Sequence, residues 1–246
     1  MKNILLISTF LIPFIFSSAT RAQQQNSVMR MTACSLNPGY SMDEAVAIAR
    51  DFPWSDNAPS GVFWREPVAY TGNNTPTWDF LSVAYFDGYA DMIEKRSANR
   101  NRDIGRNGIT FQDLASCNSL VRILDAHPAN PGDVFDDTES TIMTSFSCTL
   151  NGETTAQDAV AVVRGMGNNL DVSSQVTTRR YGGPPIAGGN QIGMSFVYSD
   201  ANDFGETLDL IASGEISPNT GLGGGNPMTC NNGSMYITHR IYGGDN

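Results

Sequence analysis

The chain has 246 residues, of which 40% are hydrophobic and 16% are charged, and its formal net charge at pH 7 is −10. Because nucleic-acid binding depends on Lys and Arg neutralising phosphates, such an acidic chain is not expected to bind DNA, RNA or an anionic membrane surface. The length suffices for one large domain or two small ones.

The chain begins with the pattern of a secretory signal peptide. A basic start precedes an apolar run over residues 4–16, and small residues then offer cleavage after Ala19 or Ala22. A transmembrane anchor would need about 20 apolar residues, and this run is shorter and contains Pro13. We therefore expect residues 1–22 to be removed, leaving a secreted or periplasmic protein without a membrane span. The segment holds two basic residues and no acidic one, so the mature net charge would be −12.

Two segments 114 residues apart share much of their sequence. Residues 34–50 and 148–164 are identical at seven of 17 positions, including the first Cys and the last Arg of each segment. Further along, Cys117 and Cys230 match at an offset of 113. We interpret the chain as two tandem copies of one unit.

Each copy is expected to contain a helix that begins with a capping box. Ser41 with Glu44, and Thr155 with Asp158, have the spacing at which a hydroxyl and a carboxylate satisfy the first amide donors of a helix. Behind each box, apolar residues recur at helical spacing and form one stripe. The stripes are Ala45, Ile48, Ala49 and Phe52 in the first copy, and Ala159, Val162, Val163 and Met166 in the second.

A second helix and four strands per copy complete the expected elements. The second helices have apolar faces formed by Tyr89, Met92 and Ile93, and by Phe204, Thr207, Leu208 and Ile211. The first strand of each copy contains Cys34 or Cys148, and aromatic and β-branched composition predicts the other strands. These lie at 62–70, 80–86 and 119–125 in the first copy, and at 172–181, 192–198 and 234–242 in the second.

The order of elements also bears on the disulfides. Four cysteines in an exported chain predict two bonds with three possible connectivities. Each copy has the order strand, helix, strand, strand, helix, strand, as in a ferredoxin-like unit. In that topology the first and last strands are neighbours, so we predict Cys34–Cys117 and Cys148–Cys230.

The segment 126–140 is rich in proline, glycine and acidic residues and is interpreted as a linker. It sets a domain boundary near residue 135. The first repeat would then span residues 23–135 and the second 136–246.

An α+β chain of two tandem ferredoxin-like βαββαβ repeats resembles the α+β barrel superfamily, in which two such units pack as a dimer or as a fused pseudo-dimer. The resemblance rests on the order of elements and on the duplication. It implies a pocket between sheet and helices. Members range from cofactor-independent monooxygenases and haem proteins to isomerases and stress proteins, and no family motif carries catalytic residues over to this chain.

Aromatic residues are unevenly divided between the copies. Trp54, Trp64 and Trp78 all lie in the first copy, together with Tyr85, and the second copy has Thr178 in place of Trp64. This asymmetry is compatible with an aromatic ligand pocket in the first copy alone. Ordinary core packing is the alternative.

Arginines and histidines supply the remaining candidates. Arg65 and Arg179 match between the copies and are candidates to hold a carboxylate ligand bidentately, the alternative being surface salt bridges. His127 and His239 are expected near the ends of the last strands. They are candidate haem or metal ligands or a proton-transfer pair, and the alternative is a structural role. Pro128, directly after His127, suggests a strand exit there. Residues 95–106 carry a basic cluster that reads as a solvated loop.

The leading hypothesis is an exported, non-catalytic protein that binds a small apolar or aromatic molecule or a protein partner, with no cofactor and no metal. One alternative is a cofactor-independent or haem-dependent oxygenase-like enzyme of the barrel superfamily. Another is a structural component of the envelope or surface. Beyond a pseudo-dimer within one chain, no oligomeric state is indicated.

Overall fold

The computed structural model describes residues 27–69, 76–99, 105–117, 121–130, 140–181, 190–215, 227–231 and 233–243. The first half contains β1 (Ser27–Leu36), α1 (Met42–Arg50), β2 (Gly61–Ala69), β3 (Phe80–Phe86), α2 (Tyr89–Asn99), β4 (Gly105–Arg106), β5 (Ile109–Thr110), α3 (Phe111–Leu114), β6 (Ala115–Ser116) and β7 (Val121–Asn130). The second half contains β8 (Ser140–Leu150), α4 (Ala156–Leu170), β9 (Ser173–Tyr181), β10 (Gln191–Tyr198), α5 (Ala201–Ser213), β11 (Met228–Cys230) and β12 (Ser234–Gly243).

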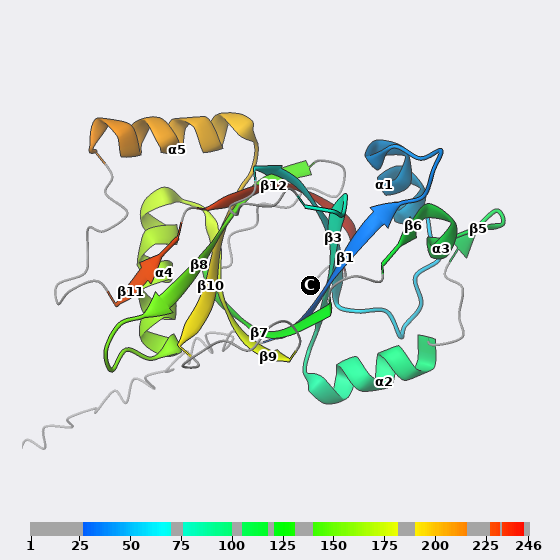
Figure 1. Cartoon of the computed structure of the whole chain (residues 1–246), viewed down its shortest axis with the longest axis horizontal. Coiled ribbons are helices and arrows are strands. Elements are labelled where there is room, and N and C mark those ends of the chain that lie inside the picture. Colours follow the sequence, from blue (N-terminus) through cyan, green and yellow to red (C-terminus); the bar gives the residue numbers. More distant parts are fainter. Residues whose placement is uncertain are drawn as a thin grey trace, which may run out of the picture.

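In the described part of the chain, eight strands close into a ring. Their order is β10-β9-β7-β1-β3-β2-β12-β8, and β8 pairs with β10 to complete it. Figure 1 shows this barrel in the middle of the molecule, with α4 and α5 on one side and α1 and α2 on the other. The protein is therefore an α+β protein with a closed β-barrel, as the expected fold class required.

Two antiparallel seams join the halves. The first half contributes four neighbouring strands, β7-β1-β3-β2, and the second contributes β9-β10-β8-β12. One seam pairs β2 with β12 and the other pairs β7 with β9. Because both edges of each half are hydrogen-bonded to the other half, the ring leaves none of these strands with a free edge.

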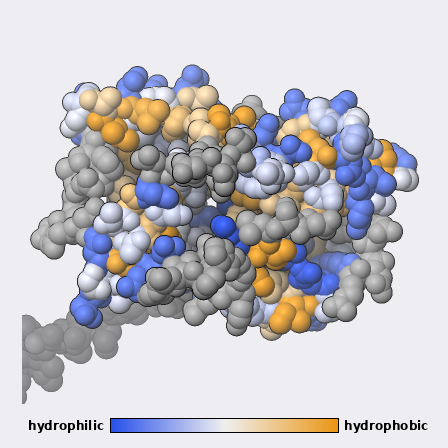
Figure 2. Space-filling view, viewed as in Figure 1, coloured by the Kyte–Doolittle hydropathy of each residue, from blue (hydrophilic) through white to orange (hydrophobic). Residues whose placement is uncertain are grey.

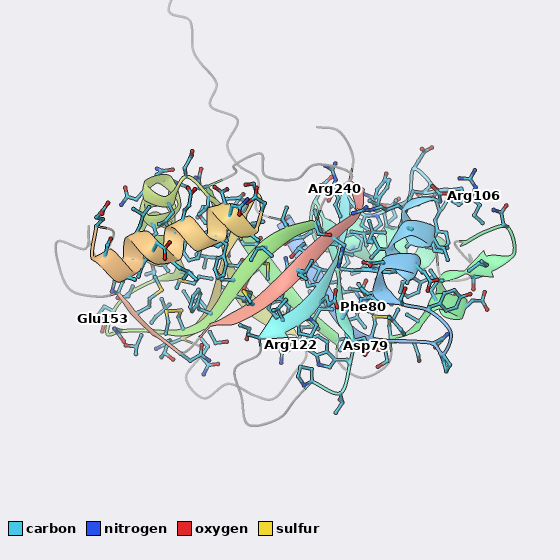
Figure 3. All side chains as sticks on the ribbon, turned by 90° about the horizontal axis from the view of Figure 1, so that it is seen from above. Asp79, Phe80, Arg106, Arg122, Glu153 and Arg240 are labelled. Atoms are coloured by element: carbon cyan, nitrogen blue, oxygen red, sulfur yellow. A yellow bond between two sulfur atoms is a disulfide. The ribbon has the colours of Figure 1, made fainter. Side chains whose placement is uncertain are left out.

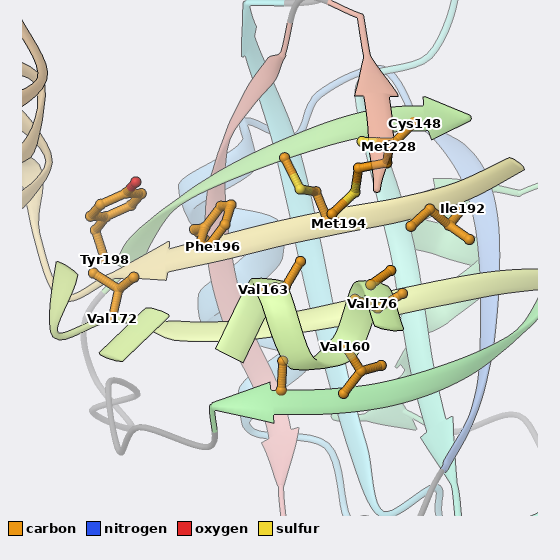
Figure 4. Packing of buried hydrophobic residues seen from close by; sticks show 12 residues of the cluster. Cys148, Val160, Val163, Val172, Val176, Ile192, Met194, Phe196, Tyr198 and Met228 are labelled. Carbon is orange, nitrogen blue, oxygen red and sulfur yellow. The ribbon is translucent and has the colours of Figure 1, made fainter. Parts of the chain in front are cut away.

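Successive side chains of each strand alternate between the inside of the barrel and the helices outside. On β1, Met29 and Ala33 pack in the inner cluster, whereas Val28 and Cys34 pack toward the helices. On the second half, Val163 of α4 packs with strand residues of β10 such as Phe196, as Figure 4 shows. The molecule thus has an inner core and outer cores under the helices.

The predicted capping boxes begin α1 and α4. Ser41 accepts from the backbone N–H of Glu44 at 3.3 Å, and the Glu44 carboxylate accepts from the Ser41 N–H at 2.9 Å. Thr155 and Asp158 make the same pair of contacts. Behind the boxes, the expected stripes are buried at Ala45 and Ala49 in α1 and at Ala159 and Val163 in α4. Val46 and Val160, which the stripes did not include, are buried as well.

The second helices bury less than their apolar pattern suggested. Met92 is the buried residue of α2, while Ile93 is 61% exposed. In α5, Thr207 is buried and Leu208 is 48% exposed. None of the described helices is both long and apolar enough to cross a membrane.

The arginine that ends each of the two similar segments, 34–50 and 148–164, links the halves. Arg50, at the end of α1, donates from Nε to the carbonyl oxygen of Arg240 in β12 at 2.8 Å. Arg164, in α4, donates from Nε to the carbonyl oxygen of Ala129 in β7, also at 2.8 Å. Each helix is therefore held to the last strand of the other half.

The two disulfides join Cys34 to Cys117 and Cys148 to Cys230, the pairing expected from the sequence. Neither second cysteine lies in the last strand of its half, however. Cys117 follows the short strand β6, which pairs with β1, and Cys230 ends β11, which pairs with β8.

The expected linker was wrong in its first part. Residues 126–130 belong to β7, which is longer than the expected strand at 119–125 and pairs with β9. Pro128 lies inside this strand and not at its exit. The pairing register with β9 shifts between Pro128 and Asn130, and proline, which has no backbone N–H, is accommodated at such irregularities. The expected signal peptide and the boundary near residue 135 lie outside the described residues.

Candidate functional site

A groove of about 660 Å³ lies on the outer face of the first half, between the barrel strands and the segments containing α1 and α2. Trp64 of β2, Ala84 and Phe86 of β3, and Met92 of α2 line it. Its volume falls within the roughly 300–1,000 Å³ of small-molecule sites. The groove is open because α1 ends after nine residues and α2 buries only Met92 against the strands.

Two tryptophans form the aromatic part of this groove. Trp64 is 1% exposed and packs on Phe80 with ring centroids 4.5 Å apart. Trp54, between α1 and β2, stacks on Tyr242 with centroids 4.9 Å apart and planes 25° apart. Both indole Nε1 atoms are buried and have no hydrogen-bond partner among the described residues. A buried donor left unpaired costs about 1–3 kcal/mol.

Cationic side chains also line the groove. Arg30 of β1 is partly buried, and its Nε is buried without a hydrogen-bond partner among the described residues. Burial and, second, the positive charge of Arg96 lower the pKa of Arg30 to about 10. Lys95, by contrast, forms an ion pair with Asp91 at 3.0 Å. Among the described residues, no acidic side chain neutralises Arg30, and the rest of the groove lining is largely apolar.

The structure brings two of the four candidate aromatics together and separates the others. Trp54 and Trp64 line the groove. Trp78 lines a cavity inside the barrel, and Tyr85 packs in the inner cluster, edge-on to Phe63 at 5.7 Å. The groove and the inside of the barrel lie on opposite faces of the same strands.

The candidate arginines are also placed differently. Arg65 lies on the inner face of β2, is 7% exposed and donates from Nη2 to the Tyr85 hydroxyl at 3.0 Å. Arg179 lies in β9 with its backbone opposite Leu124, and its side chain is outside the described part of the structure. The arginine found beside the same cavities as Arg65 is Arg122 of β7.

The histidines lie at the two seams and not in one site. His127 is opposite Val176 in the β7–β9 seam, with its Nε2 3.4 Å from the Thr178 hydroxyl oxygen. His239 is opposite Trp64 in the β12–β2 seam. These seams are on opposite sides of the ring, and neither histidine is among the residues that line the groove.

His239 lies in a short hydrogen-bonded chain. Its Nδ1 is 2.7 Å from the Ser140 hydroxyl oxygen and its Nε2 is 3.4 Å from a carboxylate oxygen of Glu66. Burial lowers the pKa of His239, although the neighbouring Glu66 carboxylate acts in the opposite direction. The imidazole is thus favoured in its neutral form, in which it can link Ser140 to Glu66.

Sequence reasoning missed Arg30 and Arg122 as site residues. The available signal was a basic residue inside an otherwise apolar strand, since Arg30 is flanked by Val28, Met29 and Met31. Such a cation must reach solvent or an anion, and that requirement alone could have marked Arg30 as a candidate.

Comparisons with known proteins add likeness of fold only. No protein-family model matches the chain, and no curated protein matches it. A solved structure of a candidate monooxygenase from Fusobacterium nucleatum subsp. nucleatum is 9% identical, with a TM-score of 0.49, covering 88% of this chain and 93% of that one. A candidate monooxygenase from Lactobacillus acidophilus is 12% identical, with a TM-score of 0.48 and coverages of 88% and 95%. An anthrone oxidase-like protein is 9% identical, with a TM-score of 0.45 and coverages of 89% and 94%.

With all three TM-scores below 0.5, these likenesses assign no activity. The class is defined by the chain's own strand order. It is an α+β barrel protein with an aromatic groove on the outer face of its first half.

Proposed function

We propose that this protein binds a small apolar or aromatic molecule with a negatively charged end in the groove of its first half. The observation that carries the proposal is one groove of about 660 Å³ that combines two tryptophans with Arg30, whose buried Nε has no hydrogen-bond partner among the described residues. The apolar walls favour burial of a hydrophobic body at roughly 25 cal/mol per Å². The arginine favours a carboxylate or sulfonate over a neutral end.

The proposed architecture is a pair of tandem ferredoxin-like repeats, each contributing half of the barrel. The strand orders support it. When the four barrel strands of each half are numbered in chain order, β7-β1-β3-β2 and β12-β8-β10-β9 both have the order fourth, first, third, second. We also propose that residues 1–22 are an export signal, in keeping with the two disulfides. Mass spectrometry of the secreted or periplasmic chain would test this by locating its N-terminus after Ala19 or Ala22.

Calorimetric titration with two matched probes tests the binding proposal. Naphthoate and naphthylmethanol have the same aromatic body and differ in the charge of one end. We expect both to bind and naphthoate to bind more tightly. Arg30→Gln should weaken naphthoate binding at least tenfold, since a hydrogen bond to a charged group contributes roughly 1.5–3 kcal/mol, and should leave the affinity for naphthylmethanol unchanged.

Two further variants make this titration specific to the groove. Ala84→Trp should abolish binding of both probes by filling the space beside Phe86. Arg122→Gln, which removes an arginine from the opposite face of the strands, should change neither affinity. Failure of the wild type to bind either probe, or an Arg30→Gln variant with unaltered naphthoate affinity, would contradict the proposal.

The same titrated samples separate binding from catalysis. After incubation in air, a binding protein returns naphthoate unchanged. Recovery of an oxygenated product that depends on the intact groove would instead support the oxygenase-like alternative.

A further inference from the structure

The inside of the barrel holds a second group of polar side chains, on the face of the strands opposite the groove. Two cavities of about 160 and 110 Å³ adjoin there and share five of their lining residues. The shared residues are Met31, Arg65, Arg122, Ser145 and Ser147. Figure 2 shows a hollow between the two halves with hydrophilic residues inside it.

Arg65 and Arg122 enter this space from β2 and β7. Figure 3 labels Arg122 in the central part of the molecule, between the helices of the two halves. The Nε atoms of both arginines are buried and have no hydrogen-bond partner among the described residues. Among the described residues, Arg65 donates a hydrogen bond to the Tyr85 hydroxyl, and no hydrogen bond or ion pair joins Arg122 to another of them.

The described residues that line the two cavities supply no negative charge to these arginines. Among the described residues that line the two cavities, none is acidic, and the other polar groups are hydroxyls and amides. Leaving a buried charge without a partner is strongly destabilising. An anion that enters the cavities would give both guanidinium groups a partner of opposite charge at once.

Residues of both halves build this space. The Tyr85 hydroxyl accepts from Arg65 at 3.0 Å and lies 3.3 Å from the Oε1 of Gln175, which comes from β9 of the second half. Ser145 and Tyr236 line the cavities from β8 and β12. The site therefore exists only when the ring of strands is closed.

We propose that the inside of the barrel binds a small oxyanion, a carboxylate or phosphate with up to two negative charges, between Arg65 and Arg122. The planar guanidinium groups suit such ligands because they can donate two parallel hydrogen bonds to them. Cavities of about 160 and 110 Å³ lie below the size of ordinary small-molecule sites, so the ligand is small. The proposal does not depend on the groove or on its ligand.

Thermal unfolding and calorimetry with malonate and with inorganic phosphate test this proposal. Sodium chloride at equal ionic strength controls for screening of the acidic surface. We expect at least one of the two probes to raise Tm in a saturable way that chloride does not reproduce. Binding of malonate alone would identify a carboxylate site, and binding of phosphate alone would identify a phosphate site.

Variants assign the binding to the two arginines. Arg122→Gln should weaken binding of the probe at least tenfold and should not lower Tm in its absence, because the Nε that it removes is buried and has no hydrogen-bond partner among the described residues. Arg30→Gln, on the groove side, should leave the affinity unchanged. If Arg122→Gln does not fold, Arg122→Lys keeps the charge but loses the paired donors, and it should also bind more weakly.

Three results would overturn the proposal. One is that neither probe stabilises the protein beyond chloride. Another is that Arg122→Gln lowers Tm and leaves the affinity for the probe unaltered, which would make Arg122 structural. The third is that Arg122→Lys binds as tightly as the wild type.

Discussion

In the second half of the barrel, the 15-residue helix α4 covers the outer face of the strands, whereas in the first half the nine-residue helix α1 leaves a groove. Val160 and Val163 of α4 pack on strand residues such as Met194. In the first half, Trp54 and Trp64 lie in the corresponding outer layer. The strands of one half thus support a closed outer core, and those of the other half border a ligand-sized groove.

The difference shows which features serve the fold and which serve a site. Both halves have a capping box, a disulfide and an arginine in the capped helix, which is Arg50 in α1 and Arg164 in α4. The tryptophans and Arg30 occur in the first half only. Changes to the common features should therefore affect the halves alike, and changes to the unmatched ones should affect ligand binding in the first half.

Removing a disulfide should lower the free energy of unfolding most, and the loss should be the same for either bond. The bonds close segments of nearly the same length, with separations of 83 and 82 residues. Replacing both cysteines of one bond by alanine should cost about 4–5 kcal/mol in the chain-entropy account. Urea unfolding of the two double variants measures this. A loss below about 1 kcal/mol in one half alone would contradict the equivalence.

The arginines that cross between the halves come next. Arg50→Met and Arg164→Met each remove a hydrogen bond from a charged group to a strand carbonyl of the other half. We expect each to lower the free energy of unfolding by about 1.5–3 kcal/mol. Arg106→Met is the control, because its ion pair with Asp51 at 3.7 Å is exposed and should contribute less than about 1 kcal/mol. Separate unfolding transitions for the two halves of Arg50→Met would show looser coupling than the seams imply.

The N-caps should give a smaller and again paired effect. Ser41→Ala and Thr155→Ala each remove a side-chain acceptor for an amide of the first helical turn. Each should destabilise by about 0.5–2 kcal/mol, and aspartate at the same position should restore most of the loss. Thermal unfolding measures both. If only Thr155→Ala destabilises, α1 contributes less to the fold than its capping box suggests.

The smallest effect concerns His239, which lies in the seam between β12 and β2. Its pKa is lowered in the folded state, mainly by burial, so the unfolded chain takes up a proton first as the pH falls. Stability from this group is complete above the unfolded pKa of about 6.5 and is lost as the pH falls through the folded pKa. His239→Gln should flatten the stability profile just below pH 6.5, as measured by urea unfolding. An unchanged slope in that variant would assign the pH dependence to other groups.

Much of the fold could be predicted because it depends on local patterns. The capping boxes, the strand at 80–86 and the cysteine pairing follow from residue spacing and from one inferred topology. The extension of β7 past Pro128 could not be predicted, because its partner β9 belongs to the other half and supplies the pairing that local composition discourages.

The candidate sites were predictable only in part, for the same reason. The concentration of tryptophans in the first half pointed to Trp54 and Trp64, which do lie together. Trp78 has the same residue type but faces the other side of the barrel. The convergence of Arg65 with Arg122 depends on the closure of the ring, and no local pattern contains that information.

The most direct test of the asymmetry uses the indole N–H signals of the three tryptophans in a ¹H–¹⁵N spectrum, assigned by single Trp→Phe variants. On addition of naphthoate, the signals of Trp54 and Trp64 should shift in a saturable way, and that of Trp78, inside the barrel, should remain in place. Equal shifts at all three, or a shift at Trp78 alone, would contradict a ligand groove on the outer face of the first half.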